Sequence, residues 1–156
     1  MNVGVIELRL GKRDRPAKGA TTMTLICLVR HGETDWNREG RLQGKTDIPL
    51  NSVGVLQAGQ CRDYLANEQW DAVISSPLAR AKQTALIINE KIQLPFSEEK
   101  AFIERDYGDA EGLSIEERLS KFPDKKYPNQ EDRSALIDRI LLGLEEIVQE
   151  WPNKRI

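Results

Sequence analysis

The sequence contains only one histidine, His31, among its 156 residues. Metal sites that hydrolyse phosphate or peptide bonds commonly combine several histidines with carboxylates. Here no second histidine is present, and the candidate acidic residues do not show the spacing of metal ligands. We therefore expect no metal, and the chemistry of His31 has to proceed without another histidine of this sequence.

Cysteines and long apolar runs are also scarce. Cys27 in an apolar run and Cys61 in a helical pattern lack metal-ligand spacing, so we interpret both as small buried side chains in a reducing compartment. No apolar stretch approaches the roughly 20 residues needed to cross a bilayer. The N-terminus also lacks the apolar core of a secretory signal. We expect a cytoplasmic protein with no membrane partner.

Neither sign of charge dominates, because 23 lysines and arginines face 25 aspartates and glutamates. The resulting net charge of -2 provides no global basic field of the kind that binds nucleic acid, so we expect no nucleic-acid partner. Any site for an anion must therefore be local. The composition is otherwise typical of one soluble globular domain.

Residues 1–22 join a short alternating apolar stretch to a basic segment that contains proline and glycine. Two alternatives account for this extension. Either the start is mis-assigned and Met23 is the natural initiator, or the segment adds an edge strand through Val3, Val5 and Leu8. We favour the first alternative, and we place the domain itself at residues 23–156.

The next hundred residues alternate between strand and helix patterns. The continuously apolar run LICLV, residues 25–29, suits a parallel strand that is buried on both faces. Asn51 can cap a helix over 52–66, and WDAVISS at 70–76 predicts a second strand. Pro77 suits the first turn of a following helix. This β-α-β-α series predicts a three-layer α/β fold with a mainly parallel sheet flanked by helices.

The C-terminal part is helical. Ser114 and Glu117 form a capping box ahead of a short helix. A last helix carries a wide apolar stripe, made of Ile137, Ile140, Leu141, Leu144, Ile147, Val148 and Trp151. Such a helix normally leads into another strand, and NKRI at 153–156 has the pattern of a strand that is beginning. We expect one or more C-terminal strands of the fold to be missing from this chain.

Polar residues follow the predicted strands at the edge where α/β proteins bind ligands. Arg30, His31 and Gly32 come directly after the first strand, and Arg80 lies in the first turns of the helix after the second. Guanidinium groups match phosphate oxygens in bidentate geometry, and a helix N-terminus adds backbone N–H donors. Gly32 allows the backbone to approach a ligand closely. The pattern predicts a phosphate pocket.

Two motifs, LVRHGETDWN at 28–37 and SSPLARAKQTA at 75–85, resemble the signatures of the histidine phosphatase superfamily, also called the phosphoglycerate mutase-like family. FIERDYGDAEG at 102–112 resembles the family's stretch that holds the leaving-group acid. With GRLQGKTDIPLNSVG at 40–54, the resemblance covers nearly all of residues 24–156. It is closer to the small bacterial phosphatase branch than to the longer glycolytic mutases.

The resemblance implies a phosphomonoester phosphatase in which His31 attacks phosphorus and forms a phosphohistidine. Arg30 and Arg80 would neutralise charge on the transferring phosphoryl group and disfavour protonated imidazole. Asn37 matches a phosphate-contacting asparagine. The implied partner is a small phosphorylated metabolite, and no cofactor is implied.

The same resemblance assigns an acid and a positioning amide. Glu104 would protonate the leaving oxygen and later take a proton from the attacking water. Gln43 matches a position that helps to orient substrate or water. Asp106, Asp109 and Glu111 lie near Glu104, so its assignment depends mainly on the family pattern.

The sequence departs from the family in one respect, because members carry a second catalytic histidine on a strand after the last helix. We therefore expect activity through His31 to be impaired, with an unpaired strand edge and uncovered apolar side chains. A phosphoglycerate mutase is one alternative. Another is an inactive phosphate-binding remnant, or a fragment that works only with a partner chain. The sequence leaves the substrate and the oligomeric state open.

Overall fold

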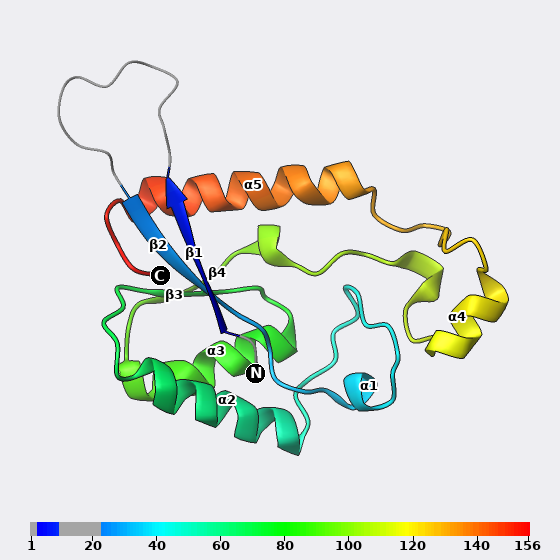
Figure 1. Ribbon diagram of the computed structural model, residues 1–156, viewed down its shortest axis with the longest axis horizontal. Helices are drawn as coiled ribbons and strands as arrows, with labels where there is room; N and C mark the ends of the chain where they lie inside the picture. Colours follow the sequence, from blue (N-terminus) through cyan, green and yellow to red (C-terminus); the bar gives the residue numbers. More distant parts are fainter. Residues whose placement is uncertain (1–2, 10–22) are drawn as a thin grey trace, which may run out of the picture.

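The computed structural model describes residues 3–9 and 23–156, and it has three layers (Figure 1). A central layer of strands separates helices α2 (Ser52–Leu65) and α3 (Ala79–Ile92) from the long helix α5 (Arg133–Glu150). The predicted α/β fold with helices on both faces of the strands is confirmed. No helix in these ranges is long and apolar enough to span a membrane.

The strands form two pairs. Strand β2 (Met23–Val29) pairs antiparallel with β1 (Val3–Arg9) along its whole length, and β3 (Val73–Ser75) pairs in parallel with β4 (Phe96–Glu98). Of the two alternatives given for residues 1–22, this pairing corresponds to the added edge strand. The side chains of Val3, Val5 and Leu8, on which that alternative depends, lie outside the described part. That Met23 is the natural initiator stays a prediction.

The last residues of the chain join the two pairs of strands. The amide of Leu25 in β2 donates to the carbonyl of Lys154 at 2.9 Å, and the amide of Asp71, just before β3, donates to the carbonyl of Arg155 at 2.7 Å. Leu25 and Arg155 form a parallel bridge. Residues 153–156 thus behave as the start of a strand between β2 and β3, as their sequence pattern predicts.

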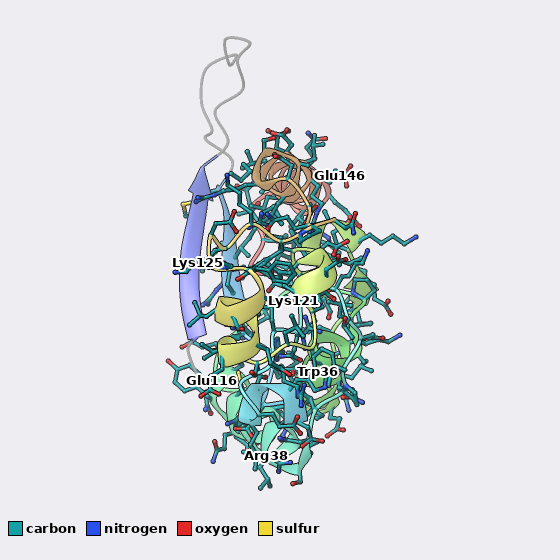
Figure 2. The ribbon with its side chains drawn as sticks, turned by 90° about the vertical axis from the view of Figure 1, so that its right-hand side faces the viewer. Trp36, Arg38, Glu116, Lys121, Lys125 and Glu146 are labelled. Atoms are coloured by element: carbon teal, nitrogen blue, oxygen red, sulfur yellow. The ribbon has the colours of Figure 1, made fainter. Side chains whose placement is uncertain are left out.

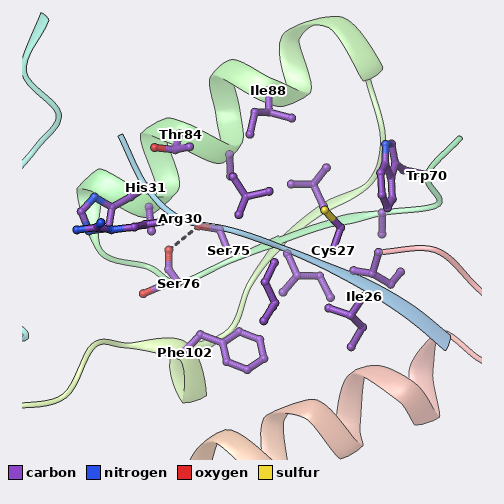
Figure 3. A pocket seen from close by; sticks show the side chains of 18 of the residues that line it. Ile26, Cys27, Arg30, His31, Trp70, Ser75, Ser76, Thr84, Ile88 and Phe102 are labelled. Atoms are coloured by element: carbon purple, nitrogen blue, oxygen red, sulfur yellow. Dashed lines mark hydrogen bonds between the residues drawn. The ribbon is translucent and has the colours of Figure 1, made fainter. Parts of the chain in front are cut away.

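Beyond Ile156, a cavity of about 380 Å³ lies between β2 and β3. Most of its walls are apolar side chains from both strands and from helices α3 and α5, and His31 lies at one end (Figure 3). Two core clusters flank it. One contains Ile26 with Ile147 and Val148 of α5, and the other contains Cys61, Leu65 and Ile88 between α2 and α3.

Two expectations about burial and helix start are wrong. Strand β2 is not buried on both faces, because Leu28 is 47% exposed and lies outside the cluster that Ile26 makes with α5. Pro77 does not occupy the first turn of α3, since the N-cap is Leu78. The missing side-chain cap is supplied from a distance, because a carboxyl oxygen of Asp47 accepts the amide hydrogen of Ala79 at 2.6 Å.

The remaining helices follow their sequence signals. The Asn51 side chain caps α2, and Ser114 and Glu117 form the capping box of α4 (Ile115–Lys121). The short helix α1 (Asp35–Arg38) precedes α2, and the 3-10 turns η1 (Lys100–Phe102) and η2 (Gly108–Ala110) precede α4. Charged side chains near α4 and on α5, such as Lys125 and Glu146, are exposed on the surface of the molecule (Figure 2).

Candidate active site

The His31 ring follows strand β2 and is held by two hydrogen bonds. Its Nδ1 atom lies 2.7 Å from the carbonyl oxygen of Gly32, and its Nε2 atom lies 3.2 Å from Nε of Arg80. A carbonyl only accepts and a guanidinium only donates, so Nδ1 carries the proton and Nε2 presents a lone pair. The contacts select one neutral tautomer of the imidazole.

The surroundings of His31 also favour its neutral form. Burial of the ring is the largest cause that lowers its pKa below the ordinary value, and the positive charges of Arg80 and Arg30 lower it further. The hydrogen bond to Gly32 and the charge of Glu104 act in the opposite direction. The net shift is downward, so the ring is unprotonated near neutral pH.

Arg80 is the most buried cation of the site, with 2% of its surface exposed. In addition to its contact with His31, it donates to the carbonyl of Gly44 at 2.7 Å and to that of Thr46 at 3.0 Å. One turn further along α3, the hydroxyl of Thr84 donates to the Arg80 carbonyl at 2.8 Å and accepts from the Gly32 amide at 3.0 Å. Arg80 is thereby fixed from both ends.

Arg30 and Glu104 border the same cavity as His31, and both side chains are exposed. Arg30 lies beside His31 at the end of β2 (Figure 3). One carboxyl oxygen of Glu104 accepts the amide hydrogen of Arg105 at 2.8 Å. The four residues predicted for phosphate binding, attack and proton transfer, which are His31, Arg30, Arg80 and Glu104, are therefore brought together.

Asn37 and Gln43 meet at a third residue, Thr34, which is fully buried. The Asn37 side-chain oxygen lies 3.1 Å from the Thr34 amide nitrogen, within the capping box of α1. The Gln43 side-chain oxygen lies 2.8 Å from the Thr34 hydroxyl. Within the described ranges, Nδ2 of Asn37 has no hydrogen-bond partner. Both amides are thus anchored by their oxygens.

Three residues that complete this arrangement are absent from the sequence prediction. Thr84, Asp47 and Glu111 act through backbone groups far from them in sequence. Only Thr84 has a sequence signal, because it follows Arg80 by one helical turn on the same face of α3. Among the residues that the structure describes, no group of three or more histidine, cysteine or acidic side chains is placed to hold a metal ion.

A family model described as the histidine phosphatase superfamily, branch 1, matches residues 26–156. The chain is 53% identical over 134 residues to the uncharacterized phosphatase PhoE of Bacillus subtilis, covering 86% of this chain and 69% of that protein. It is 32% identical over 145 residues to phosphoserine phosphatase 1 of Hydrogenobacter thermophilus, with the same 86% and 69% coverage. The chain thus spans about two thirds of these relatives' length.

Solved structures share the fold. The protein YhfR of Bacillus stearothermophilus superposes with a TM-score of 0.80 at 27% identity, over 85% of this chain and 71% of that one. A mycobacterial glucosyl-3-phosphoglycerate phosphatase in complex with VO3 superposes with a TM-score of 0.73 at 26% identity, over 81% and 64% of the two chains. The chain belongs to the histidine phosphatase superfamily.

Proposed function

We propose that this chain hydrolyses small phosphomonoesters without a metal, through a phosphohistidine at His31. The observation that carries the proposal is the neutral imidazole whose Nε2 lone pair meets the buried Arg80 guanidinium. An incoming phosphoryl group would replace the imidazole as a partner of Arg80 and receive Arg30 as a second cation. The relatives named above as phosphatases support a phosphatase assignment.

The reaction has two steps. In the first, Nε2 of His31 forms a bond to phosphorus while the ester P–O bond breaks, and Glu104 gives its proton to the leaving oxygen. In the second, Glu104 takes a proton from water as the water oxygen attacks phosphorus. The N–P bond then breaks, and neutral His31, protonated Glu104 and inorganic phosphate are formed.

Asn37 and Gln43 complete the proposed phosphate side of the site. Asn37 has its oxygen engaged with Thr34, which directs its Nδ2 group as a donor to a phosphoryl oxygen. Gln43 is 7% exposed and bound to the same threonine, so it orients the substrate or water from a fixed position. Neither amide carries charge. Both therefore orient the phosphoryl group, the substrate or water, and the arginines neutralise the charge.

Two alternatives have specific support. A phosphoglycerate mutase is favoured by a 35% identical relative named probable phosphoglycerate mutase GpmB, from Proteus mirabilis. A mutase would return the phosphoryl group to a phosphoglycerate, whereas a phosphatase gives it to water. Phosphate binding with impaired or no turnover is favoured by the cavity beside His31, which opens the site to water on the β2 and β3 side.

The test is release of inorganic phosphate from p-nitrophenyl phosphate in excess EDTA, with the chain compared to His31→Ala at equal folded concentration. The proposal predicts release that the variant loses down to the rate without protein. Equal rates in both proteins would contradict it. Bound phosphate without release would favour the binding alternative. Release of p-nitrophenol without inorganic phosphate, dependent on an added phosphoglycerate acceptor, would favour the mutase.

A further inference from the structure

We propose that Glu111 is a positioning residue that holds Arg80, and through Arg80 the His31 imidazole, in the geometry described above. The catalytic meaning of this role rests on the proposed function. The geometric role itself does not, because it concerns the resting arrangement of His31 and Arg80.

The carboxylate of Glu111 accepts hydrogen bonds from two separate segments. Oε1 accepts from the amide of Lys45 at 2.9 Å and from the amide of Tyr107 at 2.9 Å. Oε2 accepts from the amide of Thr46 at 2.9 Å and from the hydroxyl of Thr46. Hydrogen bonds to an ionised carboxylate are stronger than neutral ones, so these contacts fix the backbone at 45–46 firmly.

Arg80 binds the other side of the same backbone. The carbonyl of Gly44, which accepts from Arg80 at 2.7 Å, and the amide of Lys45, which donates to Glu111, belong to one peptide group. A trans peptide is planar, and its C=O and N–H point in opposite directions. Glu111 and Arg80 therefore bind opposite sides of the same rigid peptide group. Each hydrogen bond polarises this peptide and thereby strengthens the other hydrogen bond.

The backbone at this point is adapted to the carboxylate. Gly44 has φ of 55°, a left-handed conformation that other residues adopt at a cost. A Cβ atom at Gly44 would overlap the Glu111 carboxyl group. Only glycine lets Glu111 approach the peptide that carries the acceptor of Arg80.

Glu111 also reaches the segment that carries the proposed acid. Its bond to the Tyr107 amide fixes the backbone three residues after Glu104. One carboxylate therefore links the loop that holds Arg80 to the segment that presents Glu104. A purely local turn contact would not join these two segments.

The direction in which the His31 pKa shifts distinguishes a positioning role of Glu111 from a purely electrostatic one. Removal of the negative charge of Glu111, with nothing else moved, would lower the pKa of His31 or leave it unchanged. Loss of positioning would move the Arg80 guanidinium away from Nε2 and raise that pKa, because Arg80 lowers it in the native arrangement. The other charged groups that act on the ring are Arg30, which lowers its pKa, and Glu104, which raises it. Displacement of Glu104 would therefore lower the pKa of His31, so an upward shift reports on Arg80.

Because His31 is the only histidine, its imidazole protons give one unambiguous NMR signal, which can be followed through a pH titration. The expected result is an upward shift of the His31 pKa in Glu111→Gln. The matched control is Glu117→Gln, which removes a carboxylate that caps α4 through Ser114, and it should leave the titration unchanged. In the Arg80→Ala background, Glu111→Gln should add no further upward shift.

Gly44→Ala is the second variant, in case Glu111→Gln fails to fold. It displaces the carboxylate without changing charge and should also raise the pKa of His31. A downward or absent shift in the folded variants would overturn the proposal, as would an equal upward shift without Arg80. The titration needs no turnover, so an inactive chain still gives an answer, and failure of the proposed function remains a separate result.

Discussion

At the residue scale, the central feature is a histidine whose two nitrogens have different partners. Gly32 binds Nδ1 and thereby fixes the proton there, while Arg80 faces Nε2. A buried cation next to a ring nitrogen disfavours protonation of the imidazole. It also lies where the negative charge of a phosphoryl group would develop. In the proposed reaction, the same contact would keep the nucleophile neutral and stabilise the charge of the phosphoryl group.

The lowered pKa of His31 makes a prediction about stability. An unfolded chain would protonate His31 near the ordinary pKa of 6.5, while the folded chain does so only at lower pH. The stability that neutral His31 contributes is therefore fully present above pH 6.5 and is lost as pH falls through the folded pKa.

The measurement is the free energy of unfolding of the wild-type chain and of His31→Asn, compared between pH 4.5 and pH 8. The difference between the two proteins should change only on the acidic side, with the wild-type chain losing more stability there. Carboxylates titrate equally in both and cancel. A difference that stays constant with pH would show that the His31 pKa is not lowered by folding.

At the element scale, the positions of the main site residues follow from strand and helix patterns alone. His31 follows β2, and Arg80 begins α3 after β3, so the rule that ligands gather at strand carboxyl ends predicted their meeting. The motifs placed Glu104 beside them. The contact between His31 and Arg80 could be predicted because it depends on local patterns and on one general property of α/β sheets, whereas the position of Glu104 was implied by the family resemblance.

The residues that escaped prediction act across long distances in sequence. Asp47 caps a helix that begins at Ala79, and Glu111 binds backbone amides at 45–46. Nothing in the local pattern around an acidic residue indicates which distant amide it will bind. The exposure of Leu28 was also missed, because it depends on how far α5 covers β2 and not on the apolar run itself.

The cavity between β2 and β3 predicts low stability for this part of the sheet. Both strands present backbone groups toward it beyond residues 154–156, and apolar side chains such as Leu28, Ile137 and Leu141 remain exposed on β2 and α5. Unpaired edges and apolar patches promote association. We expect concentration-dependent aggregation and strong binding of the dye ANS, measured by light scattering and fluorescence. A monomer with a cooperative melt and no dye binding would contradict this expectation.

At the scale of the whole molecule, the three layers bring segments from across the chain to one site. The residues directly after strand β2 include Arg30 and His31, α3 supplies Arg80, and the irregular segment before η2 supplies Glu104. The fold and the family are shared with phosphatases and mutases, so neither decides which acceptor receives the phosphoryl group. What the proposed phosphatase and mutase reactions have in common is a covalent step at His31.

The most direct test of the account is to trap that covalent step. The chain is mixed with p-nitrophenyl phosphate in EDTA and quenched in alkali, and its peptides are then analysed by mass spectrometry and the quenched protein by ³¹P NMR. The proposed mechanism predicts one phosphoryl group, on the peptide that contains His31 and bonded to Nε2. Phosphate release with no phosphorylated His31, or with the phosphoryl group on another residue, would contradict it.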